Sequence, residues 1–340
     1  MSGPRMQDFH RVEVRTDRAT GLKAVFALHD LTLGPAAGGV RRWHYDSEDD
    51  AVADAMRLAE GMTCKNALAG LPFGGGKSVI LSDGKPVTRA QLRAFGRWLD
   101  QLGGEYVAAE DVGMTVEHMK EVRRETAFVT GIGAHPGPKT AHGVFVGIEA
   151  ALEGKVTGTR IAVQGLGAVG MALVELLHAA GARLIVADLD EAKVQRAMAL
   201  GAERAGTEEV LLSEVDVLAP CALGAVITPE TARHLRAKVV AGSANNQLSE
   251  PLAGHILHQR GIRYAPDYAV NAGGIIHAGY EYLGWSGAMA QIDAIGPRLT
   301  AIFAESNVTG ESTHVIADRM AHAAVAARRS HDATPAVAVA

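Results

Sequence analysis

Residues 161–170 read IAVQGLGAVG, and residues 184–188 read LIVAD. Gly165, Gly167 and Gly170 have the spacing G-x-G-x-x-G, directly after a short apolar stretch and directly before an apolar segment with helical spacing. This strand–turn–helix–strand context is what a dinucleotide-binding loop requires. The first glycine permits the tight turn, the second lets a pyrophosphate approach the backbone, and the third allows helix–strand contact. The alternative is a glycine turn in an α/β layer that binds no ligand.

The second strand of this unit ends at Asp188. A carboxylate at this place accepts hydrogen bonds from ribose hydroxyls, while the free N–H groups of the helix bind the phosphates. A 2′-phosphate would face Asp188 and Asp190 with no arginine beside them in the sequence. The pattern therefore favours NAD over NADP.

Strand and helix patterns alternate from Arg160 onward. This alternation predicts a parallel sheet with helices on both faces, and we expect a Rossmann-type domain over residues 136–310. The predicted strands are 161–164, 184–188, 215–220, 239–243 and 263–266.

The first 135 residues predict a separate, mixed α/β domain, so the fold class is α/β with two domains. The segment 131–138, GIGAHPGP, marks the boundary because its glycines and prolines cannot continue a helix. We also expect a C-terminal helix over 311–332 that returns to the first domain, and a flexible tail over 333–340. The predicted strands of the first domain are 12–16, 22–33, 78–81 and 106–109, and its predicted helices are 49–65, 88–102 and 115–126.

Length and composition agree with this organisation. At ~100–200 residues per domain, 340 residues predict two domains. Lys and Arg number 33 against 38 Asp and Glu, and a net charge of −5 is unfavourable for a general nucleic-acid binder. No apolar run reaches the ~20 residues of a membrane span, and the N-terminus lacks the apolar core of a secretion signal. With only two cysteines and no cluster of metal ligands, we expect a cytoplasmic protein without a metal site.

Three consecutive glycines precede Lys77 in the segment LPFGGGKSVI, residues 71–80. The spacing is wrong for a nucleotide-binding P-loop, since Leu71 stands where that motif has its first glycine. Glycine and apolar neighbours would partly desolvate the Lys77 amine, which lowers its pKa toward the value that a general base needs. The alternative is an exposed surface lysine.

Two further charged residues are candidates for the same chemistry. Lys65 ends the predicted helix 49–65, where it is either a ligand for an anion or a partner of the helix dipole. Asp111 follows the predicted strand 106–109, and α/β sites gather at the carboxyl ends of strands. We therefore expect Asp111 to transfer protons rather than only to cap the next helix.

The chain resembles the leucine/phenylalanine/valine dehydrogenase family over residues 10–330. These are NAD-dependent L-amino-acid dehydrogenases related to glutamate dehydrogenase. The resemblance is carried by LGPAAGGVR (33–41), MTCKNALAGLPFGGGKS (62–78), AAEDVG (108–113), VQGLGAVG (163–170), VAGSANNQL (240–248) and YAPDYAVNAGGIIH (264–277). It implies an inter-domain cleft between a substrate-binding and oligomerisation domain, 1–135, and an NAD-binding domain. It also implies a homo-oligomer that converts an L-amino acid, NAD⁺ and water into a 2-oxo acid, ammonium and NADH.

The resemblance also implies a role for each matching residue. Lys77 is the base that activates water against an iminium intermediate, and Asp111 shuttles protons to and from the substrate amine. Lys65, Gly38 and Gly39 bind the substrate carboxylate, and Asn245 holds substrate or cofactor. The side-chain pocket is lined by Ala37, Ala109, Ile275 and Ala278. The cofactor contacts are Gly165, Gly167, Ala168, Val169, Gly170, Asp188, Leu189, Cys221, Ala222, Asn245, Asn271 and Thr140.

The apolar, mostly small pocket residues predict a hydrophobic substrate, either branched-chain or aromatic. Glutamate is disfavoured because an unpaired carboxylate in such a pocket is costly. The alternatives are a related dehydrogenase for another amine or amino acid, such as tryptophan or glutamate, and a non-catalytic NAD-binding homologue. A 2-hydroxy-acid dehydrogenase would use a histidine base, and no histidine flanks Lys77 in the sequence.

Overall fold

The computed structural model describes residues 5–133 and 135–333, which form two compact units. Unit 1 consists of the chain up to His135, of Ala278–Ser286, and of the residues from Met320 on. Unit 2 consists of Pro136–His277 and Gly287–Arg319. Two predicted ranges therefore need correction, because 278–286 leaves the expected 136–310 domain and the C-terminal helix divides at Met320. Of the predicted tail, 334–340 lie outside the described residues.

The segment 278–286 groups with unit 1 because its side chains pack there. The rings of Phe73 and Tyr282 lie 6.1 Å apart between centroids. Gly279 leaves so little room that a Cβ on it would lie 3.1 Å from Phe73 and 3.3 Å from Leu71. Local sequence patterns do not reveal such a long-range contact.

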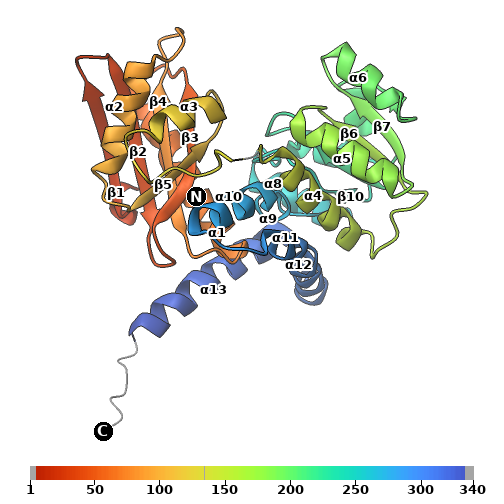
Figure 1. Ribbon diagram of the computed structural model, residues 1–340. Helices are drawn as coiled ribbons and strands as arrows, with labels where there is room; N and C mark the ends of the chain where they lie inside the picture. The colour runs from red at the N-terminus through yellow and green to blue at the C-terminus, as the bar shows by residue number, and fades with distance from the viewer. Residues whose placement is uncertain (1–4, 134, 334–340) are drawn as a thin grey trace. The chain divides into compact units, whose positions relative to one another are not determined.

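Unit 1 is built on a mixed five-stranded sheet in the order β1-β2-β4-β3-β5 (Figure 1). β1 pairs antiparallel with β2, and β2 pairs antiparallel with β4. β3 lies between β4 and β5 and is parallel to both. The strands are β1 (Arg11–Asp17), β2 (Leu22–Asp30), β3 (Ala36–Trp43), β4 (Gly74–Leu81) and β5 (Tyr106–Glu110).

Helices cover both faces of this sheet. α1 (Glu48–Leu68) buries Ala51, Ala55 and Met56 against Val25, Ala27 and Val79 on one face. α2 (Arg89–Asp100) and α3 (Val116–Val122) pack against the other face, around the stacked rings of Phe26 and Phe95. All three helices are capped at their N-termini, since Ser47, Thr88 and Thr115 each accept a hydrogen bond from the backbone N–H three residues later. A short 3-10 turn, Met6–Asp8, precedes β1.

The glycines before Lys77 lie inside a strand, so the predicted strand 78–81 begins earlier, at Gly74. Gly74, Gly75 and Gly76 belong to β4, and each faces an atom that leaves no room for a side chain. A Cβ on Gly75 would lie 2.3 Å from the carbonyl oxygen of Ala59 in α1, and one on Gly76 would lie 2.8 Å from the Tyr106 ring. The glycines thus let α1 and the sheet pack closely. β3, which the sequence did not predict, was hidden by its Ala-Ala-Gly-Gly start, since these residues have low strand propensity.

Unit 2 is built on a six-stranded sheet in the order β11-β10-β9-β6-β7-β8, and every pair is parallel. The predicted Rossmann-type parallel sheet is confirmed. Three strands are shorter than predicted, and the two-residue β8 was not predicted. The strands are β6 (Arg160–Gln164), β7 (Arg183–Ala187), β8 (Glu203–Arg204), β9 (Val217–Pro220), β10 (Val239–Val240) and β11 (Arg263–Tyr264).

The helices of unit 2 follow its strands. α7 and α8 cover one face of the sheet through a core that contains Leu218, Leu235 and Leu257. α4 packs closely on α9 and α12 because Gly143 and Gly147 lack side chains there. The helices of this part are α4 (Gly137–Ala151), α5 (Ala168–Ala179), α6 (Glu191–Met198), α7 (Pro229–His234), α8 (Pro251–Gln259), α9 (Asp267–Val270), α11 (Ala288–Asp293) and α12 (Ile295–Thr309), with a 3-10 turn at Glu209–Leu212. α10 (Gly273–Leu283) and α13 (Thr313–Ala333) each contribute to both units.

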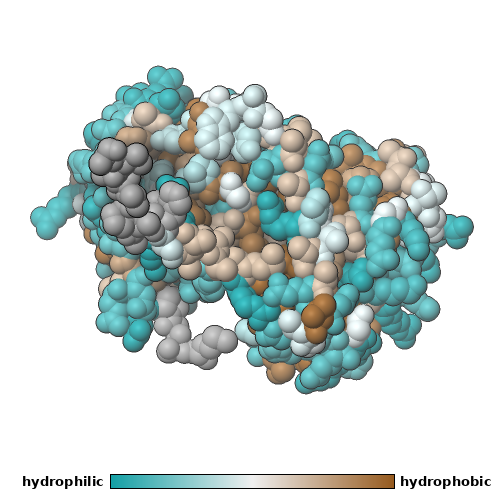
Figure 2. Space-filling view, turned by 90° about the horizontal axis from the view of Figure 1, so that it is seen from below, coloured by the Kyte–Doolittle hydropathy of each residue, from teal (hydrophilic) through white to brown (hydrophobic). Residues whose placement is uncertain are grey.

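No helix in the described ranges combines the length and apolar character needed to cross a membrane. Figure 2 shows one face of the molecule, on which hydrophilic residues predominate and hydrophobic residues are interspersed.

The packing of α1 on β4 predicts that Gly75→Ala destabilises the protein. The added methyl would lie 2.1 Å from Thr63 Oγ1 and 2.3 Å from two backbone atoms of α1, so the helix must move. Overpacking of this kind costs about 1–3 kcal/mol. We expect a lower thermal midpoint in differential scanning fluorimetry.

Gly61→Ala is the matched control because Gly61 lies within the same helix and a Cβ there would meet nothing within 4 Å. This change should raise the midpoint, since alanine is favoured over glycine in a helix by about 1 kcal/mol. A Gly75→Ala protein as stable as wild type would contradict the proposed packing constraint.

Candidate active site

The centre of unit 1 holds a buried ion pair between two of the predicted residues. Lys77 Nζ lies 2.7 Å from Asp111 Oδ2, and Lys77 is only 5% exposed. Lys77 comes from β4, and Asp111 directly follows β5, so the two residues reach toward each other over the intervening strand β3. Gly39 makes this contact possible, because a Cβ on it would lie 2.6 Å from Asp111 Cβ and 3.2 Å from Lys77 Nζ. Lys77 is therefore not the exposed surface lysine of the alternative interpretation.

Arg41, which the sequence analysis did not select, completes this cluster. Its Nε lies 3.3 Å from Asp111 Oδ2, and its Nη1 lies 2.9 Å from Asp54 Oδ2. Asp54, on α1, also accepts hydrogen bonds from the Tyr45 hydroxyl at 2.6 Å and from Arg57 Nη2 at 2.7 Å. Side chains two apart on a strand share a face, so recognising β3 would have placed Arg41 beside Gly39 and the ion pair.

These contacts keep Asp111 ionised. Burial raises the pKa of Asp111, but the positive charges of Lys77 and Arg41 outweigh burial and lower the pKa to about 2. Burial likewise opposes the charged forms of Arg41 and Asp54. The charges of Asp111 and Asp54 nevertheless raise the pKa of Arg41, and the Tyr45 hydroxyl, Arg57 and Arg41 lower the pKa of Asp54. At neutral pH the Asp111 side chain is thus a negatively charged carboxylate.

The end of α1 is fastened beside this cluster through Asn66. Its buried Nδ2 donates hydrogen bonds to the carbonyl of Gly74 at 2.7 Å and to that of Ala37 at 3.3 Å. The predicted residue Lys65 precedes Asn66 in the last turn of the helix. The carbonyl oxygens of Gly38 and Gly39 accept hydrogen bonds from the buried Tyr106 hydroxyl. Asn66 and Tyr106 were not predicted as site residues. The sequence feature that could have identified them is a polar group inside an apolar segment.

Two of the predicted pocket residues, Ala109 and Ala278, lie close to Gly131. A Cβ on Gly131 would lie 3.7 Å from Ala278 Cβ and 3.9 Å from Ala109 Cβ, so these three small residues meet. Ile275 lies three residues before Ala278 on α10, and Ala37 is buried within β3. Ala278 is also buried.

In unit 2 the glycine loop has the geometry of a phosphate-binding turn. Gly165 has a φ of +93°, and a Cβ on it would lie 2.7 Å from Ala222 Cβ. A Cβ on Gly170 would lie 1.9 Å from the carbonyl oxygen of Gly165 and 3.3 Å from Cys221 Cβ. By contrast, a Cβ on Gly167 would meet nothing within 4 Å. The loop is thus packed on its inner side and open at Gly167.

The open side of the glycine loop is next to the first turn of α5, which begins with Ala168 and Val169. The N-cap residue Gly167 has no side chain that could cap the helix, which leaves the first N–H groups of α5 suited to an anion. The loop therefore fits a dinucleotide pyrophosphate. Cys221 contacts Ser243, and burial raises the pKa of its thiol, which makes it a packing residue rather than a nucleophile.

Asp188 lies directly after β7, whereas the sequence predicted it as the last residue of that strand. Its Oδ2 accepts a hydrogen bond from the Leu166 N–H at 2.6 Å, and its Oδ1 accepts one from the Asp190 N–H at 2.8 Å. Burial raises the pKa of Asp188, but these backbone donors hold it below its usual range. The neighbouring Leu189 is 92% exposed, so a large apolar surface lies next to this carboxylate.

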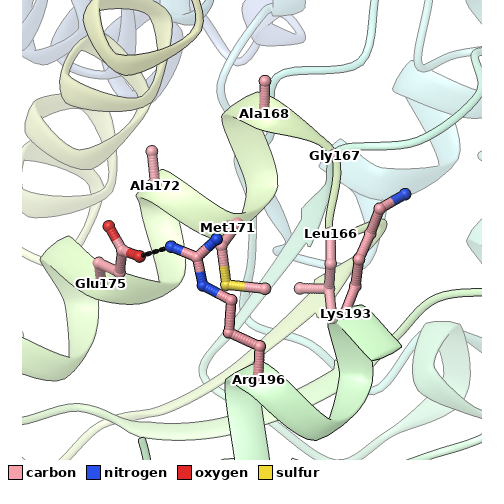
Figure 3. A pocket seen from close by; sticks show the side chains of 8 residues that line it. All are labelled: Leu166, Gly167, Ala168, Met171, Ala172, Glu175, Lys193 and Arg196. Atoms are coloured by element: carbon pink, nitrogen blue, oxygen red, sulfur yellow. Dashed lines mark hydrogen bonds and ion pairs between the residues drawn. The ribbon is translucent and has the colours of Figure 1, made fainter. Parts of the chain in front are cut away.

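A pocket of about 370 Å³ borders the glycine loop (Figure 3). Two cations that the sequence analysis did not consider, Lys193 and Arg196 of α6, line it. Each is paired with a carboxylate, since Lys193 Nζ lies 3.3 Å from Asp190 and Arg196 Nη2 lies 2.6 Å from Glu175. The pocket thus has no excess positive charge from these two side chains.

The structure brings together Asn245, Asn271 and the start of α4. Asn271 Nδ2 donates hydrogen bonds to Asn245 Oδ1 at 2.8 Å and to the Ser243 carbonyl at 3.1 Å. Its buried Oδ1 has no hydrogen-bond partner within the described part of the chain, so it is free to accept an amide N–H. A Cβ on Gly274 would lie 2.7 Å from Thr140 Oγ1, which places Thr140 beside this group. These residues fit the carboxamide end of a dinucleotide.

Among residues 5–133 and 135–333 no three His, Cys, Asp or Glu side chains are arranged to hold a metal ion. The rings of His255 and His314 contact each other edge to face, with 4.9 Å between their centroids. Both ring nitrogens of His314 are buried.

Comparison with known proteins agrees with this geometry. The family model for the dimerisation domain of Glu/Leu/Phe/Val dehydrogenases matches residues 6–128. The model for the glutamate/leucine/phenylalanine/valine dehydrogenase domain matches residues 186–329. Leucine dehydrogenase of Bacillus cereus is 46% identical over 346 residues, covering 96% of this chain and 93% of the relative. Valine dehydrogenase of Streptomyces virginiae is 42% identical over 323 residues, covering 90% of each.

Among solved structures, the crystal structure of L-tryptophan dehydrogenase from Nostoc punctiforme matches with a TM-score of 0.85 and 38% identity, covering 95% of this chain and 97% of that one. The two family models match in chain order, and relatives of this similarity span nearly the whole chain. The chain therefore belongs to the glutamate/leucine/phenylalanine/valine dehydrogenase family of amino-acid dehydrogenases.

Proposed function

We propose that the protein catalyses the reversible oxidative deamination of a hydrophobic L-amino acid to its 2-oxo acid and ammonium, with NAD as the hydride acceptor. The observation that carries this proposal is the buried pair of Lys77 and Asp111, which places an amine and a carboxylate 2.7 Å apart. Deamination needs both groups, because the substrate amine must lose protons and a water molecule must be deprotonated. The family relationship supports the same reaction.

Two residues of unit 1 each carry out a different proton transfer in this proposal. Asp111, which is ionised at neutral pH, takes a proton from the substrate ammonium and returns protons to the departing amine. Lys77 in its neutral form takes a proton from the water that attacks the substrate iminium carbon. Lys65, at the end of α1, binds the substrate carboxylate by its charge, and backbone groups at Gly38 and Gly39 assist it. NAD, when bound, supplies the acceptor for the hydride from the substrate.

The residues of unit 2 hold the cofactor. Gly165, Gly167, Gly170 and the N-terminus of α5, with Ala168 and Val169, bind the pyrophosphate. Asp188 accepts hydrogen bonds from the ribose, and Leu189 and the Cys221–Ala222 segment pack against the adenosine half. Asn245, Asn271 and Thr140 hold the carboxamide end. A 2′-phosphate would be repelled by Asp188, which favours NAD over NADP.

The substrate side chain occupies the region of Ala37, Ala109, Ile275 and Ala278. Since all four residues are apolar, they favour a branched-chain or aromatic substrate side chain. A carboxylate on the substrate side chain, as in glutamate, would have no partner there. Relatives named leucine, valine and tryptophan dehydrogenase support this range. We further propose a homo-oligomer, because the first family model describes a dimerisation domain, and a cytoplasmic location.

The first test is turnover with a panel of amino acids. NADH absorbance should rise with leucine, valine or phenylalanine, with tryptophan as a further candidate, and should not rise with glutamate. Lys77→Ala should lower kcat by about 10²–10⁴-fold, the range for a general base, while NADH binding by fluorescence stays near that of wild type. Lys85→Ala is the control, because the Lys85 side chain is 83% exposed. A wild-type protein that binds NADH but turns over no amino or oxo acid would support the non-catalytic alternative.

The second test concerns the cofactor. Wild type should bind NADH more tightly than NADPH. Asp188→Ser should lower the ratio of the NADPH Kd to the NADH Kd by about tenfold, because it removes a negative charge that faces the 2′-phosphate. The measurement is a fluorescence titration with each cofactor. Glu191→Gln is the control, since it removes a charge from the next turn without changing Asp188. An unchanged ratio in Asp188→Ser would contradict the proposed role of this carboxylate.

A further inference from the structure

Asp111 Oδ2 is shared by two cations, and only one of them takes part in the proposed chemistry. Lys77 Nζ contacts this oxygen at 2.7 Å, and Arg41 Nε lies 3.3 Å from the same oxygen. Arg41 comes from β3, the strand between the two catalytic residues. We propose that Arg41 is a positioning residue that remains the counter-ion of Asp111 while Lys77 gives up and regains its proton. This inference rests on the proposed function and adds a residue to it.

The need for a second cation follows from charge. When Lys77 is neutral, as a base must be, it no longer balances the Asp111 anion, whose side chain is only 17% exposed. A buried charge without a partner is strongly unfavourable. Arginine keeps its proton at any pH that a protein tolerates, so Arg41 balances Asp111 in both states of Lys77. With Arg41 present, loss of the Lys77 proton leaves a paired carboxylate rather than an isolated one.

Asp54 fixes Arg41 in this position. The Arg41 guanidinium bridges two carboxylates from different elements, with Nε on Asp111 and Nη1 on Asp54. Asp54 is itself held by Tyr45 and Arg57, and its side chain is 16% exposed. Its helix, α1, also carries Lys65 in its last turn. The Asp54–Arg41 contact thus links α1, which carries the proposed substrate ligand Lys65, to Asp111, the proposed proton-transfer group.

Other titratable groups surround the pair and must be considered in any pH measurement. Glu110 precedes Asp111 on β5, and the negative charge of Asp111 contributes to the raised pKa of Glu110, of which burial is the larger cause. These groups are the same in wild type and in the Arg41 variants, so a difference between the two proteins reports on Arg41. They are Glu110 and Tyr106 on β5, whose pKa values burial and, to a smaller extent, the charge of Asp111 raise, and Asp54 and Tyr45, of which Asp54 contacts Arg41 and Tyr45 contacts Asp54.

The experiment compares four single variants of the full-length protein. Arg41→Gln removes the cation, and Arg41→Lys keeps a charge but loses the planar fork that bridges two carboxylates. Asp54→Asn keeps Arg41 and removes its anchor. Arg42→Gln is the matched control, because Arg42 is the next residue of β3 and its guanidinium instead donates to the carbonyl of Lys85. For each variant, kcat and KM are measured against pH, with NADH affinity and thermal midpoint as further readouts.

We expect Arg41→Gln to lower kcat by about tenfold to 100-fold, the effect of a misplaced reacting group, with KM for the amino acid and NADH affinity changed less than threefold. The rising limb of kcat against pH should move to higher pH, because Asp111 without Arg41 holds the proton on Lys77 more strongly. Added guanidinium, below concentrations that unfold the protein, should restore part of the kcat. Asp54→Asn should lower kcat and move the rising limb of the pH profile in the same direction as Arg41→Gln, but by a smaller amount. The kcat and pH profile of Arg41→Lys should lie between those of wild type and Arg41→Gln.

Several results would overturn the inference. Wild-type kcat and pH dependence in Arg41→Gln would show that Lys77 needs no second cation beside Asp111. A loss of kcat with an unmoved pH limb and no rescue by guanidinium would assign Arg41 a purely structural role, as would equal losses in Arg42→Gln. If Arg41→Gln does not fold, Asp54→Asn and Arg41→Lys decide by the same criteria. Failure of the proposed function is distinguishable, because wild type itself would then turn over no amino acid.

Discussion

The pairing of Lys77 with Asp111 across Gly39 is the constraint on which unit 1 depends. Adjacent strands of a sheet are ~4.8 Å apart, so residues on β4 and after β5 meet only if the strand between them presents no side chain. Gly39 meets this condition. Buried charges must also be balanced, and the pair, Arg41 and Asp54 form an alternating series of positive and negative groups. The glycines of β4 and the Asn66 contacts then hold α1 close enough for Asp54 to take part.

The two units use different physical means for their proposed tasks. Unit 1 relies on charged side chains whose protonation is controlled by their neighbours, as proton transfer requires. Unit 2 relies on the backbone, with a left-handed glycine at Gly165, an open glycine at Gly167 and an uncapped helix N-terminus. Even Asp188, its main carboxylate, is oriented by two backbone N–H donors. A diphosphate is recognised well by such N–H groups because its charge is spread over several oxygens.

Family membership and the residues of this chain contribute different parts of the functional argument. The comparisons show an amino-acid dehydrogenase, and the relatives named in them differ in substrate. The choice among substrates depends on the chain's own small residues, of which Ala109 and Ala278 lie around Gly131. Removing methyl groups from the wall of a pocket changes its volume without changing its polarity. The small apolar residues therefore favour a hydrophobic substrate class rather than one particular amino acid.

The sequence by itself determined the parallel sheet, the glycine loop, and Lys77 and Asp111 as candidates, because each depends on residues close together along the chain. The tertiary structure alone decided that Gly74–Gly76 form a strand, that 278–286 joins unit 1, and that Arg41 and Asp54 support the ion pair. These features arise from contacts between elements that are distant in sequence. Arg41 and Asp111 are 70 residues apart, and no local periodicity shows that β3 lies between β4 and β5.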